Sequence, residues 1–321
     1  MSARFYIVAP CTNRKQLPPP PELCLRSVRE RELNVRVRAW TGRLEHHASS
    51  TCLAGEMYAG DHWSVVRTLS RIVEAGGFEP ETWIISAGYG LVSTKAALHA
   101  YSATFAAGHA DSISAGAARS RTDAVNQAWW GSLSEWSGPQ PRAPRSLEAL
   151  AQRDPNARML IFGSPSYVRA VEKDLLAAID RLEVPERLVL VSTRDVEGSR
   201  LARHLVVGDA RVQSEFGGAR VSLHARVARH LLKVALDCEW HVSRLRLRYQ
   251  EVLRAVPEAN MDQRKKMTDT EIHQFIVEQL ARDPRATATR LLRALREGGS
   301  ACEQARFKTL FVETRKRVHG A

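Results

Sequence analysis

The chain has few cysteines, and those it has are scattered. The five thiols are odd in number and include no Cys-x-x-Cys pair: Cys11, Cys24, Cys52, Cys238 and Cys302. Zinc ribbons, iron–sulfur clusters and disulfide scaffolds need clustered or paired cysteines, so this spacing argues against all three. We therefore expect no metal, no cofactor and a reducing compartment.

Long hydrophobic runs are missing as well. No apolar stretch approaches the roughly 20 residues that a helix needs to span a bilayer. The first residues lack the basic-then-apolar pattern of a secretory signal. We expect a soluble, cytoplasmic protein that uses no membrane, and the sequence indicates no obligate protein partner.

Positive charge, in contrast, is abundant. The 321 residues carry a net charge of +12, and most of the excess is arginine. Arginine suits bidentate contacts to phosphate better than lysine does. A basic chain with ordinary hydrophobic content is a candidate nucleic-acid binder, and its length predicts two domains. We therefore expect DNA as the partner.

The most informative stretch is Arg4–Lys15. An apolar run, Phe5 to Val8, ends at a proline and opens into the polar pentapeptide Cys11-Thr12-Asn13-Arg14-Lys15. Such runs are typical of buried parallel strands, and open α/β sheets bind ligands beyond the carboxyl ends of their strands. The pentapeptide is therefore either part of a site for a phosphate-bearing ligand or an ordinary solvated loop.

Further strands and helices alternate along the chain. Asp61 is a candidate N-cap for a helix, and Ser164 and Pro165 suit the start of another. Apolar and polar residues alternate over 34–40, which predicts a strand or a loop. The tryptophans within the weakly patterned residues 93–156 either stack bases or pack this segment, as an excursion, onto the rest of the domain. The pattern predicts an α/β domain over residues 1–243, a parallel sheet with helices on both faces. The expected strands are 83–87, 159–162, 188–191 and 204–207, in addition to 5–8.

The C-terminal part has a different pattern. Residues 244–266 are highly charged and predict a linker or a bridging helix. Residues 267–321 predict three helices in a helix-turn-helix-like, DNA-docking domain. From residue 259 onward there are 13 Lys and Arg against 8 Asp and Glu. A small bundle with a solvated basic face is one alternative, and a tail that folds back and completes the core through Phe307, Leu310 and Phe311 is another. The expected phosphate contacts are Arg306, Lys308, Arg315, Lys316 and Arg317.

Three motifs together resemble a known group of proteins. They are Cys11–Lys15, then Ala54, Tyr58, Gly60 and His62-Trp63, then Ile84 to Leu91. This order resembles the YaaA-related, queuine-ribosyltransferase-like proteins of prokaryotes and phages over about the first third of the chain. The layout is also similar to uracil-DNA-glycosylase-like domains. The resemblance implies a DNA glycosylase that removes a modified base, such as a hypermodified phage base, in antiviral defence.

The resemblance also implies roles for individual residues, which the chemistry of base excision allows. Asn13 would orient water or the base, and Asp61 would act as general base or stabilise charge, unless it is only a helix N-cap. Two members of the expected base pocket have a purely structural alternative: Ser86 as a hydroxyl at a strand end, and Cys11 as a small buried thiol. The base pocket would comprise Cys11, Tyr58, His62, Trp63, Ser86 and Tyr89, and the phosphate contacts near it Arg14, Lys15, Ser164 and Ser166.

Two other functions remain open from the sequence. One is a nucleobase transglycosylase or another nucleotide-processing enzyme on the same fold, and the other is a DNA-binding stress protein without enzymatic activity. The enzymatic functions share one structural expectation. The loops 11–15, 86–89 and 163–167 should meet at one edge of the sheet, because each follows the carboxyl end of a parallel strand.

Overall fold

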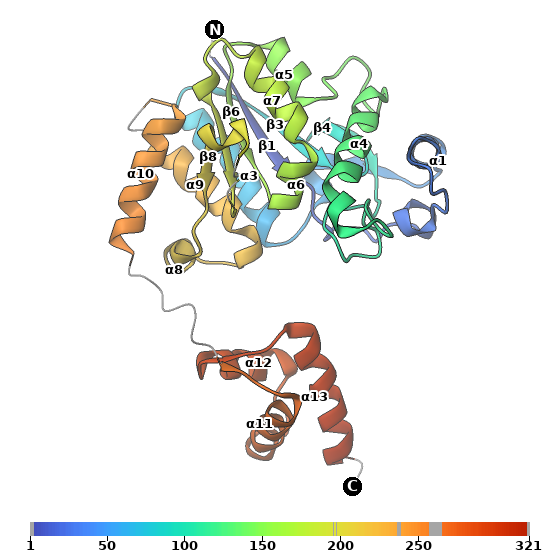
Figure 1. The fold of residues 1–321 in the computed structure, drawn as a ribbon, viewed down its shortest axis with the longest axis vertical. Coiled ribbons are helices and arrows are strands. Elements are labelled where there is room, and N and C mark those ends of the chain that lie inside the picture. Colours follow the sequence, from blue (N-terminus) through green and yellow to red (C-terminus); the bar gives the residue numbers. More distant parts are fainter. Residues whose placement is uncertain (1–2, 195, 197, 236–238, 257–264, 320–321) are drawn as a thin grey trace. The chain divides into compact units, whose positions relative to one another are not determined.

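The computed structural model describes the chain except residues 1–2, 195, 197, 236–238, 257–264 and 320–321 (Figure 1). Its contacts divide it into two compact units, Met1–Pro257 and Glu258–Ala321. Each unit has a hydrophobic core of its own. We describe the two units separately as unit 1 and unit 2.

Unit 1 is built on a six-stranded sheet with β1 (Arg4–Pro10) near its centre. Residues 5–10 of β1 are all buried, as expected for an apolar strand that is covered on both faces. All neighbouring strands run parallel except β4, which is antiparallel to β3. The predicted α/β class with a mainly parallel sheet is therefore confirmed. The strand order is β4 (Gly90–Ser93), β3 (Glu79–Ser86), β1, β6 (Arg158–Phe162), β7 (Leu188–Ser192) and β8 (Leu205–Val207).

Helices cover both faces of this sheet (Figure 1). On one face α3 and α9 pack together against β1, β3, β6 and β7. On the other, α4 contacts α6, and α5 contacts α7. The helices of unit 1 are α1 (Leu33–His46), α2 (Ala54–Met57), α3 (Asp61–Ala75), α4 (Thr122–Glu135), α5 (Leu147–Arg153), α6 (Pro165–Ala170), α7 (Glu172–Arg181), α8 (Gln213–Phe216), α9 (Leu223–Val234) and α10 (Val242–Ala255).

The segment that alternates at residues 34–40 is a helix, so the prediction of a strand or loop there is wrong. Helix α1 buries Val37, Trp40, Thr41 and Leu44, which recur at helical spacing. The carboxylate of Glu32 accepts the amides of residues 34 and 35 and satisfies the exposed helix start. The longer helical period and its cap outweigh the short Val–Arg alternation.

Residues 93–156 pack onto the body of unit 1 as an excursion. Strand β5 (Ala97–His99) pairs antiparallel with β2 (Thr51–Leu53). The ring nitrogen of Trp129 donates to the Ala87 carbonyl at 2.8 Å, and that of Trp130 donates to Asp174 at 2.8 Å. Both rings are buried. The packing interpretation is therefore right for these two tryptophans, which are not available to stack bases.

The helix α10 belongs to unit 1, so unit 1 extends beyond the predicted boundary at residue 243. Its Val242, Leu245 and Tyr249 are buried in the core of unit 1. The hydroxyl of Tyr249 accepts the Asp209 amide at 3.0 Å, which ties α10 to the loop after β8. Of the predicted linker or bridging helix over residues 244–266, the first part is a helix that packs on unit 1, and residues 257–264 lie outside the described residues.

Unit 2 contains the three predicted helices and a short parallel pair of strands. Thr268 and Glu271 form a reciprocal capping box at the start of α11, and Thr287 caps α12. Phe307, Leu310 and Phe311 are buried in the core of unit 2 itself. The elements are α11 (Asp269–Arg282), α12 (Ala288–Glu297), α13 (Gln304–His319), β9 (Lys265–Lys266) and β10 (Ser300–Ala301). Across the described parts of both units, no helix is long and apolar enough to cross a membrane.

Candidate functional site

The three predicted loops meet at the carboxyl edge of the sheet. The Cys11 amide donates to the Ile85 carbonyl at 3.0 Å, and the Ala87 amide donates to the Cys11 sulfur at 3.5 Å. The Cys11 sulfur also lies 3.1 Å from the Tyr167 hydroxyl, which follows β6. Because β1 lies between β3 and β6, Cys11 contacts both neighbouring strand ends. The structural expectation is therefore confirmed, with the buried thiol of Cys11 at the junction.

A cluster of buried hydroxyl groups lies beside Cys11. The Tyr101 hydroxyl is 3.0 Å from that of Tyr58 and 2.6 Å from the Ser86 hydroxyl. Burial raises the pKa values of both tyrosines well above the ordinary value, so the phenols are neutral donors. A Cβ atom at Gly88 would lie 2.5 Å from the Tyr101 ring, so the turn after β3 needs a glycine for this close approach. We call Tyr58, Ser86, Tyr101, Tyr167 and Cys11 the hydroxyl cluster.

Ser86 has the strand-end role that the sequence left open. Its hydroxyl accepts the backbone amides of Gly88 and Tyr89 at 3.3 and 2.9 Å. These bonds hold the turn after β3 while the same oxygen contacts Tyr101. The Tyr89 hydroxyl is bound to the backbone of His99, and its ring is buried. Ser86 and Tyr89 therefore shape the wall behind the loops rather than an open surface.

Lys15 points its ammonium group at this cluster. The ammonium lies 4.4 Å from the centre of the Tyr101 ring and 5.6 Å from that of Tyr58. It donates to the Thr12 carbonyl at 3.1 Å. A backbone bridge between Lys15 and Tyr58 fixes the base of the side chain. Burial lowers the pKa of Lys15, against the opposing influence of Cys11, Asp111 and Cys24. Lys15, which the sequence predicts to contact phosphate, is thus a half-buried cation beside two aromatic rings.

Asn13 and Arg14 lie on the exposed outer side of the same loop. The Arg14 carbonyl accepts the Ala59 amide at 2.9 Å, which anchors the loop to the segment before α3. Ser164 and Ser166 are half-buried, and their hydroxyls lie 3.1 Å apart at the start of α6. These four polar residues belong to the loops that meet at the carboxyl edge, so each remains a candidate for contact with a ligand.

Asp61 is not the N-cap of α3, so that interpretation is wrong. Gly60 occupies the cap position, with φ +91°, and Asp61 is the first helical residue. Its carboxylate instead receives two bonds from Arg226 at 2.7 and 2.9 Å. It also accepts the Ser222 hydroxyl and the Ala219 amide. These contacts tie α3 to the start of α9.

The same contacts set the charge of Asp61. Partial burial acts to raise its pKa, but the bonds from Arg226, Ser222 and Ala219 outweigh this and hold the pKa below its ordinary value. Asp61 is therefore a well-satisfied carboxylate that links two helices. A role as general base stays a prediction, and its saturated hydrogen bonds argue for a positioning role.

His62 and Trp63 are both buried, but they face different neighbours. The Trp63 ring stacks on Tyr58, with 4.9 Å between ring centres, and donates to the Pro10 carbonyl. His62 faces Phe162 and His224, with 5.0 Å between the two imidazole rings. Burial lowers the pKa of His62 to about 4 and that of His224 to about 3. Trp63 thus backs the hydroxyl cluster, whereas His62 belongs to a neighbouring part of the core.

Sequence reasoning missed Tyr101, Arg226 and Asp111. Tyr101 lies in the weakly patterned segment, and Arg226 lies on a helix 165 residues after its partner Asp61. Asp111 is almost fully buried, where it accepts the Arg26 amide and the Ser102 hydroxyl. No local pattern marks these residues, because their partners are distant in sequence. Tyr167 lay within a predicted loop, but its bond to Cys11 was not anticipated.

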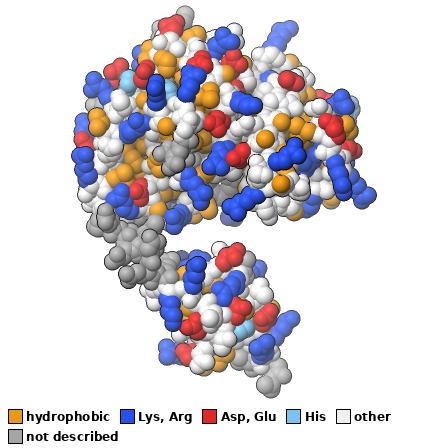
Figure 2. Space-filling view, in the orientation of Figure 1, with side chains coloured by type: hydrophobic (Ala, Val, Ile, Leu, Met, Phe, Trp, Pro, Cys, Tyr) orange, Lys and Arg blue, Asp and Glu red, His pale blue; other side chains and the backbone are white. Residues whose placement is uncertain are grey.

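The predicted phosphate contacts of unit 2 have different environments. Arg306 is bound to Asp269 and donates to the Met267 carbonyl at 3.0 Å, so it holds α13 to the start of α11. Lys308 and residues 315–317 are exposed. Figure 2 shows Lys and Arg side chains spread over the visible faces of both units rather than gathered in one patch. Charge alone therefore does not locate a binding surface.

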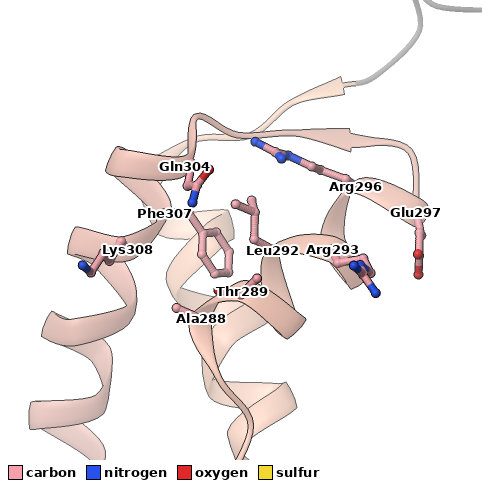
Figure 3. A pocket seen from close by; sticks show the side chains of 9 residues that line it. All are labelled: Ala288, Thr289, Leu292, Arg293, Arg296, Glu297, Gln304, Phe307 and Lys308. Atoms are coloured by element: carbon pink, nitrogen blue, oxygen red, sulfur yellow. The ribbon is translucent and has the colours of Figure 1, made fainter. Parts of the chain in front are cut away.

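A groove between α12 and α13 does provide a shaped surface on unit 2 (Figure 3). Its cavity volume is about 530 Å³. Leu292 and Phe307 point toward each other at its floor, while Arg293 and Lys308 lie on opposite walls. Arg296 donates to the Cys302 carbonyl at 2.9 Å and is therefore partly engaged. We call this surface the α12–α13 groove; its lining also includes Ala288, Thr289, Glu297 and Gln304.

The described residues contain no group of three or more His, Cys, Asp and Glu side chains that could hold a metal ion. No protein-family model matches the chain, and no curated protein or solved structure matches it either. The resemblance to YaaA-related and glycosylase-like proteins therefore stays a prediction that rests on three sequence motifs and their order.

Proposed function

We propose that unit 1 is a DNA glycosylase that excises a modified base, such as a hypermodified phage base, in antiviral defence. The observation that carries this proposal is the half-buried Lys15 ammonium, held under two tyrosine rings at the carboxyl edge of the sheet. Ligands of open α/β sheets bind at this edge. Asn13, Arg14 and Lys15 come from one loop that the Ala59 amide anchors to the segment before α3.

The chemistry of base excision matches these groups. The enzyme flips the nucleotide out of the helix at a cost of a few kcal/mol, and the sugar develops positive charge as the base leaves as an anion. A cation near the leaving base lowers the energy of that anion, and in this proposal the protonated form of Lys15 supplies it. Asn13 is exposed on the same loop and carries a carboxamide that can orient the attacking water.

The hydroxyl cluster has a supporting role in this proposal. Tyr58 and Tyr101 are fully buried, so they fix Lys15 and Cys11 from behind rather than forming an open base pocket. Their neutral phenols exchange hydrogen bonds with Ser86 and with each other. A fixed wall of this kind keeps the reacting groups in one geometry, which is a main source of catalytic rate.

Unit 2 would dock the DNA. The exposed Lys308 and Arg293 flank the α12–α13 groove, and neither forms an ion pair among the residues that the structure describes. Unpaired cations can each neutralise a phosphate and release a counterion. Arg306 would contribute less than the sequence suggested, because it is already bound to Asp269.

Base release from DNA tests the function directly. The full chain is incubated with phage DNA containing modified bases and with unmodified DNA, and released bases and abasic sites are quantified by mass spectrometry. We expect base release from modified DNA only. Asn13→Ala should lower this release at least about 100-fold while DNA affinity changes only a few-fold.

The matched control is Asn34→Ala, which removes an exposed carboxamide from α1, outside the three loops. It should release base at the wild-type rate. Tight DNA binding without base release from any substrate would contradict the glycosylase and leave a DNA-binding protein. Incorporation of a free base in exchange for the released one would instead indicate a transglycosylase.

A further inference from the structure

The environment of Lys15 is unusual for a lysine that only binds phosphate. An ammonium group has three N–H donors, and here the Thr12 carbonyl accepts one. Within the described part of the chain, no carboxylate forms an ion pair with Lys15, and its ammonium lies over the rings of Tyr101 and Tyr58. Phosphate-binding lysines normally keep their charge in water, whereas this side chain is half-buried.

Two features make Lys15 accessible as well as desolvated. Tyr58 and Tyr101 are fully buried, whereas Lys15 beside them retains exposed surface. Its loop lies at the carboxyl edge beside the exposed Asn13 and Arg14. Burial lowers the pKa of Lys15 and so increases the fraction of neutral amine. A neutral, desolvated lysine is the form that attacks carbonyl carbon.

We propose that Lys15 forms a covalent imine with the aldehyde of an abasic deoxyribose in DNA. This inference rests on the proposed function, because the abasic sugar is the product that base excision leaves in the site. It adds a covalent step in which the enzyme holds its product through Lys15 rather than releasing it at once.

The imine forms by nucleophilic addition followed by loss of water. The lone pair of the neutral Lys15 Nζ attacks the C1′ aldehyde carbon of the open sugar, and a C–N bond forms. The carbonyl oxygen takes up the two amine protons and leaves as water, so an imine remains between Nζ and C1′. Water hydrolyses the imine in the reverse direction and regenerates both the lysine and the aldehyde. No oxidant or reductant takes part.

Borohydride trapping on a preformed abasic site tests this step. The probe is a duplex oligonucleotide with one abasic site, and sodium borohydride reduces any imine to a stable secondary amine. We expect a covalent protein–DNA adduct with the full wild-type chain and none with a tetrahydrofuran analogue, which has no aldehyde. Lys15→Arg, which keeps the charge but not the nucleophile, should lower adduct yield at least tenfold.

Lys95→Arg is the control, because Lys95 is an exposed lysine outside the three loops. It should trap DNA as the wild type does. Peptide mapping of the wild-type adduct provides an answer that needs no variant, and we expect the modified peptide to contain Lys15. An adduct that maps to other lysines, an undiminished yield in a folded Lys15→Arg, or no adduct in the wild type would each overturn the proposal.

The probe separates this inference from the glycosylase proposal, because its base is already absent. Trapping at Lys15 without base release from any modified DNA would support the imine and contradict the glycosylase. Base release without trapping would support a glycosylase that uses water alone.

Discussion

Unit 1 binds some of its arginines inside the fold, whereas several arginines of unit 2 lie on its surface. In unit 1 the guanidinium groups of Arg145 and Arg226 are bound inside the fold, to backbone carbonyls and to Asp61 respectively. In unit 2 Arg293, Arg315 and Arg317 are exposed. Both kinds count equally in the net charge of +12, but only the second kind is available to a phosphate backbone. A basic composition therefore overstates the binding surface wherever arginine stabilises the fold.

The largest expected effect on stability comes from replacing an arginine that is bound inside the fold. Arg145 donates to the carbonyls of Leu91, Tyr89 and Leu133 at 2.6, 2.5 and 3.2 Å. Burial lowers its pKa to about 10. Arg145→Met keeps much of the stem but leaves these carbonyls unsatisfied, so we expect the free energy of unfolding to fall by about 3 kcal/mol.

Tryptophan fluorescence during urea unfolding measures this loss. All seven tryptophans lie in unit 1, so the signal follows unit 1 alone. Arg119→Met, at an exposed arginine, is the control and should stay within about 0.5 kcal/mol of the wild type. Equal stability of Arg145→Met and the control would mean that Arg145 is not structural.

A second large effect follows from the buried histidines of unit 1. The pKa of His62 is about 4 in the folded state, against an ordinary value of 6.5. The unfolded chain therefore binds more protons between these values, so the stabilisation is present above pH 6.5 and is lost as the pH falls toward 4. The shift corresponds to about 3 kcal/mol. Burial and the neighbouring His62 lower the pKa of His224 to about 3. Because the two imidazoles interact, their contributions to the loss of stability do not add.

Urea unfolding at several pH values, again followed by tryptophan fluorescence, measures the acid dependence. His62→Gln should flatten the curve between pH 6.5 and 4, because it removes one of the groups that must be protonated. His46→Gln, at an exposed histidine on α1, should leave the slope unchanged. An unaltered slope in His62→Gln would show that other groups cause the acid sensitivity.

The exposed cations of unit 2 should affect binding rather than stability. Arg293→Ala combined with Lys308→Ala removes two cations from opposite walls of the α12–α13 groove. We expect DNA affinity to fall about tenfold at moderate salt and the log–log salt slope to decrease by about 0.9 for each contact. Fluorescence anisotropy with a short duplex over a range of salt concentrations measures both quantities.

Arg282→Ala combined with Arg285→Ala is the matched control, since it removes the same formal charge from residues that do not line the groove. An equal loss of affinity in both double variants would indicate non-specific charge. An unchanged slope in the groove variant would exclude this groove as the phosphate contact.

The smallest effect distinguishes two cations of the same helix. Arg306 is bound to Asp269, whereas Arg315 is exposed. Arg306→Gln should weaken unit 2 only slightly, because the ion pair with Asp269 is partly exposed and screened by water. Amide hydrogen exchange in α11 measures this loss. Arg315→Gln should leave exchange unchanged, and equal protection in both variants would contradict the structural role of Arg306.

Much of the fold of unit 1 could be predicted because its signals are local. The strands β1, β3 and β6 are short apolar runs, and the rule that parallel strands end at one edge was enough to bring Cys11 and Tyr167 into one region. Helix α1 was missed because a short Val–Arg alternation masked its helical period. Residues 244–255 form a helix, as one of the two alternatives predicted, but its packing on unit 1 was not anticipated because charged residues on α10 conceal three buried ones.

The details of the site depended on contacts that no local pattern encodes. The partners of Asp61 lie about 160 residues away, so a helix-start aspartate could not be distinguished from a linking carboxylate. Tyr101 approaches Lys15 only because the excursion folds back onto the sheet. Sequence therefore predicted which loops meet, whereas the orientation of their side chains required the tertiary structure.

The short strand pair in unit 2 has a mechanical consequence. The described part of unit 2 begins at β9, where the Lys265 amide donates to the Gly299 carbonyl at 3.0 Å, and β9 pairs with β10. Strand β10 lies between α12 and α13 in the chain, so it joins the two walls of the α12–α13 groove. A pulling force applied to the backbone at β9 therefore acts first on the β9–β10 pair. Through β10 it then acts on α12 and α13, the two helices that form the groove.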